Sequence, residues 1–432
     1  MISPLVLPVD FERSDEFQQC YEIVEKTEKS VYVSGVAGSG KSTFLTFLRQ
    51  NTRKNLIVLT PTGIAAVNIQ GQTIHSLFKF PHALIQKENI KRLWANGLFE
   101  KLDLLVIDEI SMVRPDLLDG VDYALRLNRE RFDTPFGGVQ VVMIGDLYQL
   151  PPVLEKELAE HYSELYASEF FFSANVLKEM RCYSFMLTKN YRQKDPQFMA
   201  LLNKIRNNSI NEADLRLLNS RVNSELAEVA KEYLRLTPTN AAANAVNHAR
   251  LAKLPGKEFL YQATVTGEYD WRSHPADEQL RLRVGAQVLM VKNDPDKRWV
   301  NGNIGEVVEL ASNGMKVRID HGIYDVQPVK WEKNGYRHDG IKGIVPEVIG
   351  TFEQFPVRLG WAITIHKSQG LSLDKAIVDL DGGAFAHGQT YVALSRCRSF
   401  EGLVLKRPVG FRDIIFDKRI HRVADLFIPI NT

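Results

Sequence analysis

Over the first third of the chain, short runs of consecutive apolar residues alternate with segments whose apolar residues recur at helical spacing. The runs lie at residues 30–34, 55–60, 104–107 and 140–144. Residues 41–49 and 116–131 carry the helical pattern, the second with a charged opposite face. Strands that are apolar on every residue and connected by helices predict a parallel sheet that is covered on both faces.

A second block of the same kind begins near Tyr183. It contains a strand at Tyr233–Thr237 and a helix at Ala241–Lys253, and it resumes near Leu359 with a helix and a strand at Lys375–Leu380. The repeated alternation of strand and helix predicts a second α/β domain.

Residues 255–355, inside the second block, have a different pattern. They are rich in glycine and turns, and their short segments alternate apolar and polar positions. This pattern predicts a small antiparallel barrel inserted into the second domain. The predicted fold class is therefore α/β, with two parallel-sheet domains and a β-barrel insertion. The predicted boundaries are 1–180, 181–254 plus 356–432, and 255–355.

The composition excludes only a few classes of protein. Lys and Arg total 54 against 52 Asp and Glu, so a nucleic-acid partner would need a local basic groove. The three cysteines, Cys20, Cys182 and Cys397, form no CxxC pair, which favours a reducing compartment over a zinc site or a disulfide framework. The first eleven residues are a poor match to a signal peptide, and no apolar run reaches membrane-spanning length. We therefore expect an intracellular, cytoplasmic protein with no membrane partner, associated with the nucleoid if its source is prokaryotic.

Residues Gly35–Thr43, GVAGSGKST, match the phosphate-binding pattern G-x-x-x-x-G-K-[ST] between a predicted strand and a predicted helix. Glycines let backbone N–H groups turn towards phosphate oxygens at a helix N-terminus, which already favours anions. We predict that Lys41 reaches the β- and γ-phosphates of ATP and that Ser42 coordinates Mg²⁺. The predicted nucleotide contacts are Gly35, Ala37, Gly38, Ser39, Gly40, Lys41, Ser42 and Thr43. The alternative, a glycine-rich turn that binds nothing, is disfavoured by the flanking strand and helix.

Two acidic residues, Asp108 and Glu109, follow the apolar run at 104–107. An acid at a strand tip can hold the magnesium shell, and a second acid beside it can accept the proton of an attacking water. We assign Asp108 to the metal and to nucleotide binding, and Glu109 to the general base; the alternative is a pair of solvated acids. Gln149, after the next run, is predicted to hydrogen-bond the γ-phosphate or the attacking water.

Two arginines of the second block, Arg192 in LTKNYRQ and Arg396 in YVALSRCRS, are candidates to stabilise the charge that hydrolysis builds on the transferred phosphoryl group. An arginine in this role accelerates hydrolysis by roughly 10³–10⁵-fold. The alternative is that both are surface residues. In the catalytic role they place ATP between two domains, so that hydrolysis opens and closes the cleft.

Residues 60–80, TPTGIAAVNIQGQTIHSLFKF, combine hydroxyl and amide side chains with aromatic ones after a predicted strand. Hydroxyls and amides bond phosphates, and an aromatic ring stacks a base for about 1–3 kcal/mol. The second block holds a similar piece, LTPTN at 236–240, as well as TIHKSQG at 364–370. The candidate contacts to a polymer track are Thr62, Asn68, His75, Ser76, Phe78, Lys79, Thr239, Asn240, His366 and Lys367. The alternative is that the phenylalanines belong to the core and the histidine bonds a backbone group.

These motifs, in this order, resemble those of the superfamily 1 DNA helicases, and most closely the Pif-type branch (petite integration frequency family), which is related to RecD-like and Dda-like enzymes. The matching segments are GVAGSGKS, TPTGIAA, TIHSLF, VIDEIS, GDLYQLPPV, NYRQ, TIHKSQG and VALSRCRS. The segment ending in PFGGVQ also resembles the signature region of this branch. Together the motifs are specific and cover nearly the whole chain.

The resemblance implies two RecA-like P-loop domains with ATP and Mg²⁺ between them, and a single-stranded DNA groove across both. It also implies 5′-to-3′ movement and unwinding of duplex or forked DNA. In the family's pattern Gln18 reads the adenine, with Gln19 as the alternative, and Gly370 lies at the nucleotide. A wedge is expected within 81–98, in an insert at about 78–100. Residues 255–355 match the family's small barrel.

Some alternatives stay open at the level of sequence. G-quadruplexes and RNA–DNA hybrids are candidate substrates that no motif distinguishes, and we expect a monomer in solution. A DNA-stimulated ATP switch that clamps DNA without unwinding it would use the same motifs. A P-loop kinase would leave LTPTN, TIHKSQG and the second domain unexplained.

Overall fold

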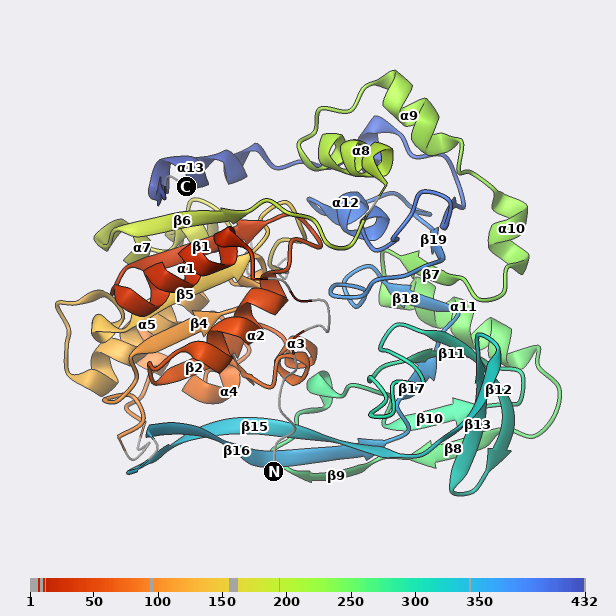
Figure 1. The fold of residues 1–432 in the computed structure, drawn as a ribbon, viewed down its shortest axis with the longest axis horizontal. Helices are drawn as coiled ribbons and strands as arrows, with labels where there is room; N and C mark the ends of the chain where they lie inside the picture. Colours follow the sequence, from red (N-terminus) through yellow and green to blue (C-terminus); the bar gives the residue numbers. More distant parts are fainter. Residues whose placement is uncertain are drawn as a thin grey trace.

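The computed structural model describes residues 7, 11, 13–93, 97–154, 162–193, 195–341 and 343–430 of the 432-residue chain. Two α/β lobes lie side by side, and a β-rich part next to the second lobe sends a long hairpin past the first (Figure 1). The predicted α/β class, with two parallel sheets and a β-rich insertion, is confirmed. Among the residues described, no helix is both long and apolar enough to cross a membrane.

Seven parallel strands form the sheet of the first lobe, in the order β21-β6-β1-β5-β4-β2-β3. Their bounds are β1 (Ser30–Gly35), β2 (Leu56–Thr60), β3 (Gln72–Thr73), β4 (Leu104–Ile107), β5 (Gln140–Gly145), β6 (Cys182–Leu187) and β21 (Phe427–Pro429). All four runs predicted as strands lie in this sheet. The loops that follow β1, β4 and β5 carry the predicted ATP residues, so these three neighbouring strands position the site.

Helices cover both faces of this sheet, as the continuous apolar strands predict. They are α1 (Asp15–Lys26), α2 (Lys41–Asn51), α3 (Gly63–Asn68), α4 (Ile74–Phe78), α5 (Pro115–Arg129) and α7 (Val176–Glu179). Alternate residues of a strand enter different cores: Val31 and Val33 pack with α1 and α2, whereas Tyr32 packs with α5. Burial on both faces explains why the strands are apolar at every position.

The second lobe is a smaller parallel sheet in the order β18-β7-β19-β20. Its strands are β7 (Leu234–Thr237), β18 (Ala362–Thr364), β19 (Ala376–Val378) and β20 (Leu403–Leu405). The helices of this lobe are α8 (Pro196–Arg206), α9 (Glu212–Asn219), α10 (Ser224–Val229), α11 (Asn240–Ala252) and α12 (Gln389–Leu394). The strands predicted at Tyr233–Thr237 and Lys375–Leu380 are confirmed with slightly shorter bounds, and the helix predicted at Ala241–Lys253 is confirmed one residue earlier. The helix predicted near Leu359 is wrong, because this stretch forms the strands β17 (Val357–Leu359) and β18 and then turns.

The β-rich part is antiparallel, as predicted, and contains three sheets. The largest joins β14 (Gly322–Val326), β13 (Gly314–Ile319), β12 (Ile304–Ala311), β11 (Gln287–Met290) and β17 (Val357–Leu359). The second pairs β8 (Phe259–Gln262) with β10 (Gln279–Leu282). The third contains β15 (Val329–Asp339), β16 (Gly343–Gln354) and β9 (Thr264–Gly267).

The β15–β16 hairpin leaves the β-rich part and packs on the first lobe (Figure 1). The Tyr336 hydroxyl accepts a hydrogen bond from the Val58 N–H at 3.1 Å and lies 3.3 Å from the Val58 carbonyl oxygen. The backbone N–H of Ile344 donates to the Asn55 Oδ1 at 3.4 Å. The Tyr336 contacts involve backbone groups of β2, which lies next to the short edge strand β3, and Asn55 directly precedes β2.

The boundary predicted between residues 180 and 181 differs from the observed one. β6, placed in the second domain by prediction, pairs with β1 in the first sheet along its whole length. The C-terminal β21, also assigned to the second domain, pairs with β6. A strand pattern predicts a strand but does not specify which sheet it joins, and β6 and β21 complete one side of the first sheet.

Candidate nucleotide site and inter-lobe cleft

The loop between β1 and α2 has a backbone shape that requires glycine. Gly38 and Gly40 have φ values of +85° and +84°, in the left-handed region. A Cβ at Gly38 would lie 2.5 Å from the Cβ of Arg192, a contact that side chains do not make. Gly40 also caps α2 without a side chain, which leaves the first N–H groups of this helix available to an anion.

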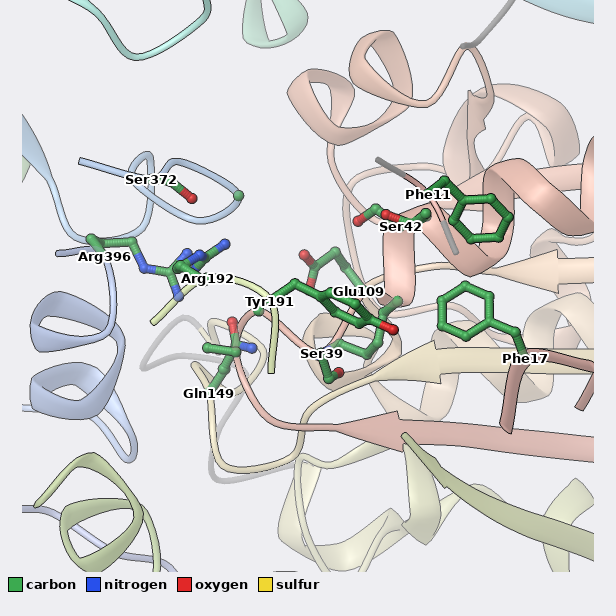
Figure 2. Close-up of a pocket in the computed structure, with 16 residues that line it drawn as sticks. Phe11, Phe17, Ser39, Ser42, Glu109, Gln149, Tyr191, Arg192, Ser372 and Arg396 are labelled. Atoms are coloured by element: carbon green, nitrogen blue, oxygen red, sulfur yellow. The ribbon is translucent and has the colours of Figure 1, made fainter. Parts of the chain in front are cut away.

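A cavity of about 440 Å³ lies against this loop, between the two lobes (Figure 2). It is lined by Phe11, Phe17, Ala37, Gly38, Ser39, Gly40, Lys41, Ser42, Thr43, Glu109, Gln149, Tyr191, Arg192, Gly370, Ser372 and Arg396. Of the predicted catalytic and nucleotide residues, Gln18, Gly35 and Asp108 lie outside this lining. Because Gly370, Ser372 and Arg396 come from the second lobe, the cavity is shared by both lobes.

Lys41 is partly buried where it lines the cavity. Its Nζ donates to the carbonyl oxygens of Gly35 and Val36, at 2.8 and 3.1 Å. Burial lowers its pKa, although the carboxylates of Asp146, Glu109 and Asp108 oppose this shift. The ammonium group is therefore held by loop carbonyls that a phosphate oxygen could replace.

Two carboxyl groups follow β4, of which Asp108 is buried and Glu109 is partly buried. Burial and the adjacent Glu109 raise the pKa of Asp108 to about 7. Burial also raises the pKa of Glu109, whose φ of +52° is a strained conformation for this residue type. Strain and crowded like charges of this kind are typical of functional sites.

The residues predicted to hold Mg²⁺ have the right chemistry. Asp108 and Ser42 line a second cavity that shares Ser42, Glu109 and Gly370 with the first. Hard oxygen donors suit Mg²⁺, which binds through one or two protein groups together with phosphate oxygens and water. In the described part of the chain, no group of three or more His, Cys, Asp or Glu side chains could hold a metal alone. The donor set therefore fits an ion that arrives with its nucleotide.

Arg192 and Arg396 lie next to each other at one end of the cavity, opposite Phe11 and Phe17 (Figure 2). Burial and the neighbouring Arg192 lower the pKa of Arg396 to about 9. The Arg396 Nε donates to the Val392 carbonyl at 2.9 Å, and an Arg192 Nη donates to the Ser395 carbonyl at 3.3 Å. Two adjacent cations, one buried and one partly buried, favour an anion between the lobes. The alternative that both arginines are surface residues is wrong for Arg396, which is 1% exposed, and Arg192 is likewise mostly buried.

Sequence reasoning missed the aromatic side of the cavity. Phe11 and Phe17 have ring centroids 5.7 Å apart, and Tyr191 lies between them and the arginines in the view of Figure 2. Tyr191 is next to Arg192 in NYRQ, and Phe17 is next to Gln18. A search for aromatic residues next to the predicted polar ones would have found Tyr191 and Phe17.

Gln18 lies in α1, outside the cavity lining. Its Nε2 donates to Glu22, whereas its Oε1 is buried and lacks a hydrogen-bond partner among the described residues. Gln19, the alternative, is exposed. A buried acceptor without a donor costs free energy unless a ligand supplies one, which favours Gln18 over Gln19.

The second cavity, of about 720 Å³, lies between α3, the second lobe and the β-rich part. Four of the predicted track residues line it, namely Thr62, Asn68, His366 and Lys367. The β-rich part contributes Lys292, Asn293, Asn301 and Trp331, which no sequence motif indicated. The cleft therefore passes along the tips of both lobes and next to the ATP cavity.

The TPT segments of the two lobes fold in the same way. Thr62 caps α3 and Thr239 caps α11, each accepting the N–H three residues further on, at 3.4 and 3.2 Å. Thr60 and Thr237 each donate a hydroxyl hydrogen bond to the carbonyl two residues on, at 2.8 and 3.2 Å. The similarity predicted between TPTG and LTPTN is thus present in the backbone.

The remaining predicted track residues lie outside the cleft. The Ser76 hydroxyl accepts from the Gln72 Nε2 at 3.0 Å, His75 stacks on His82, and Lys79 pairs with Glu268 at 3.1 Å. Thr239 and Asn240 are exposed at the start of α11.

The prediction that Phe78 stacks a base is wrong for this structure. Phe78 is 3% exposed, and its ring stacks on Phe80 and Phe99 at centroid distances of 5.3 and 5.7 Å. The alternative reading, that these phenylalanines are core residues, holds because α4 is a short helix whose apolar residues Ile74, Leu77 and Phe78 are all buried. In the expected wedge region, Ile85, Ile90 and Leu98 are buried in the same core, and residues 94–96 are outside the described part.

Comparison with known proteins decides the family. The PIF1-like helicase family matches residues 11–216. The ATP-dependent DNA helicase Pif1 of Bdellovibrio bacteriovorus is 32% identical, over 97% of this chain and 93% of its own. The chain belongs to the PIF1-like helicase family. The human ATP-dependent DNA helicase PIF1 is also 32% identical, over 87% of this chain but 58% of its own length.

Solved structures of PIF1-like helicases share the fold. Bacteroides sp. Pif1 in complex with ADP-AlF4 is 38% identical, with a TM-score of 0.87 over 98% of this chain and 100% of that one. Unliganded Pif1 from Bacteroides sp. gives a TM-score of 0.85, and Bacteroides Pif1 bound to ssDNA gives 0.71, each over 96% of this chain and 97% of that one. The arrangement described here is closer to the unliganded relative than to the one bound to ssDNA.

Proposed function

We propose that this protein is an ATP-dependent DNA helicase that moves 5′ to 3′ along single-stranded DNA and unwinds duplex and forked DNA. The observation that carries the proposal is the shared cavity, where the phosphate loop of the first lobe faces Arg192 and Arg396. A nucleotide held by both lobes would couple its hydrolysis to their relative movement. The relative named ATP-dependent DNA helicase Pif1 supports this activity.

In the proposed reaction Lys41 exchanges its two carbonyl partners for β- and γ-phosphate oxygens. Glu109 accepts the proton of the attacking water, and Gln149 orients that water or the γ-phosphate. Arg192 and Arg396 stabilise the charge that develops on the phosphoryl group. Ser42 and Asp108 would hold Mg²⁺, which neutralises phosphate charge when bound.

The proposed adenine site lies near α1, where the buried Oε1 of Gln18 would accept a hydrogen bond from the exocyclic amine of adenine. Phe11, Phe17 and Tyr191 provide the apolar surface that a base needs. Gly370 would contact the nucleotide from the second lobe.

The proposed DNA track is the cleft of about 720 Å³, with Thr62 and Asn68 on one side and His366 and Lys367 on the other. Polar and cationic groups of this kind contact phosphates rather than base edges, so binding would be largely independent of sequence. The structure of Bacteroides Pif1 bound to ssDNA and a structure of two coordinating Pif1 helicases at forked dsDNA support this class of partner. We further propose that the protein is a monomer in solution, acts on G-quadruplexes and RNA–DNA hybrids as well, and works inside the cell.

Strand displacement tests the proposal. Partial duplexes of identical sequence carry a single-stranded tail at either the 5′ or the 3′ end, and the Lys41→Ala variant serves as the ATP-dead control. We expect product from the 5′-tailed substrate only. Product from the 3′-tailed substrate alone would refute the polarity, and no product from either substrate, despite DNA-stimulated hydrolysis, would favour a clamp. A G-quadruplex and an RNA–DNA hybrid with 5′ tails test those substrates in the same assay.

A further inference from the structure

Arg206 is a buried cation to which the proposed reaction gives no role. It is the last residue of α8 in the second lobe, and its side chain is 11% exposed. Charged side chains are rarely buried unless they are paired. Lys204, on the same helix, is 44% exposed and pairs with Asp214 of the same lobe at 2.7 Å. The two cations of this helix therefore have different partners and different surroundings.

Arg206 reaches across to the first lobe. Its Nη2 lies 3.1 Å from the Oδ1 of Asp146, whose side chain is completely buried. Its guanidinium carbon lies 3.6 Å from the ring centroid of Tyr148, a close cation–π contact. Both partners belong to the loop that follows β5 in the first lobe. One side chain of the second lobe thus contacts this loop through an ion pair and through a stacked ring.

Hydrogen bonds within the loop connect this contact to the ATP cavity. The Oδ2 of Asp146 accepts from the Gln149 Nε2 at 3.2 Å, and its Oδ1 accepts from the Tyr148 N–H at 3.2 Å. Burial opposes ionisation of Asp146, but Arg206 and Lys41 hold its pKa below the usual value, so it remains an acceptor on both oxygens. Gln149 lines the ATP cavity. A single carboxylate therefore joins Arg206 of one lobe to Gln149 of the other.

We propose that Arg206 is a positioning residue that orients Gln149 for hydrolysis while the second lobe contacts the loop after β5. In this structure Arg206 holds Asp146, and Asp146 holds the amide of Gln149. When the lobes separate, Arg206 moves away with α8, Asp146 is solvated, and the Gln149 amide loses its fixed partner. This inference rests on the proposed function, since it requires Gln149 to act on the γ-phosphate or the attacking water.

The test compares Arg206→Met with Lys204→Met, a matched change that removes a cation from the same helix. Methionine keeps the apolar stem of arginine but removes the ion pair and the stacking. We expect the kcat of ssDNA-stimulated ATP hydrolysis to fall about 10- to 100-fold in Arg206→Met, the cost of misplacing a group near the reacting atoms. The KM for ATP should change little, since Arg206 touches no residue of the phosphate loop. Equal kcat values in the two variants would overturn the proposal.

A double variant separates positioning from stability. Arg206→Met alone leaves a buried carboxylate without its cation, so the melting temperature should fall. Asp146→Asn combined with Arg206→Met removes both charges and should restore most of the melting temperature, while kcat stays low because the second lobe no longer holds the loop. Recovery of kcat together with the melting temperature would show a merely structural role and overturn the proposal. A wild-type protein without DNA-stimulated hydrolysis would instead refute the proposed function itself.

Discussion

The two lobes each carry a glycine loop that leads into a helix, but only one of these loops has room for a nucleotide. The first, GVAGSGKST at 35–43, precedes α2, and the second, GAFAHGQT at 383–390, precedes α12. Gly40 and Gly388 both cap their helix in the left-handed conformation, with φ values of +84° and +70°. The two loops therefore share their helix-capping geometry.

Their surroundings differ. Lys41 and Ser42 line a cavity, whereas Gln389 and Thr390, the residues that follow the last glycine of the second loop, are 0% and 2% exposed. A Cβ at Gly388 would lie 2.4 Å from the carbonyl oxygen of Tyr148, so protein backbone occupies the space beside this glycine. A glycine loop at a helix N-terminus is thus not sufficient for a phosphate site. The second loop instead packs against the segment of the first lobe that carries Gln149.

The largest effect expected is that of Lys41→Ala. Removing the ammonium group leaves the β- and γ-phosphate charge without its partner, so ATP hydrolysis should fall to background. The measurement is phosphate release at saturating ssDNA, with the melting temperature to show that the fold is intact. Gln389→Ala, the matched change in the second loop, should retain hydrolysis. Similar losses of ATP hydrolysis in both variants would show that the two loops do not differ in function.

Arg396→Ala comes next, with an expected loss of about 10³-fold in kcat, since an arginine aimed at the phosphoryl group contributes at least this much. Affinity for ssDNA, measured by fluorescence anisotropy, should change far less. A matching loss in kcat and in DNA affinity would indicate a folding defect and would contradict a role for Arg396 at the phosphoryl group.

Gln389→Lys completes the pattern G-x-x-x-x-G-K-[ST] in the second loop. Because the position is fully buried, the new charge should lower the melting temperature, and calorimetric titration should still find one nucleotide per chain. Gln389→Met controls for the loss of the amide. A second nucleotide bound to Gln389→Lys would show that the sequence pattern alone decides binding.

The smallest effects expected are those of the two helix caps. Thr62→Ala and Thr239→Ala each remove one cap hydrogen bond, so each should cost about 1 kcal/mol in the free energy of unfolding. Only Thr62 lines the cleft, and only Thr62→Ala should also weaken binding of ssDNA. Equal losses of DNA affinity would place Thr239 on the track as well.

Features that depend on contiguous residues could be predicted from the sequence. The strands of the first sheet, the phosphate loop and the acids after β4 each follow from a local pattern, and Arg192 and Arg396 line the same cavity as that loop. The family resemblance, which the comparisons confirm, rests on these same motifs.

Features that depend on distant partners could not be predicted. Nothing within CYSFML specifies that β6 pairs with β1, and nothing near Tyr336 indicates that its hydroxyl contacts β2. The burial of Phe78 follows from stacking on Phe99, which lies 21 positions further along the chain. Arg206 carried no motif, and only its buried contact with Asp146 marks it.

The central claim is that one ATP site, shared by two lobes, is coupled to DNA in the adjoining cleft. The most direct test is the rate of ATP hydrolysis by the wild-type protein with and without single-stranded DNA, at the same nucleotide and Mg²⁺ concentrations. Coupling predicts strong stimulation by DNA, because DNA that contacts both lobes would bring Arg192 and Arg396 to the phosphates. An equal rate in the two conditions would contradict it.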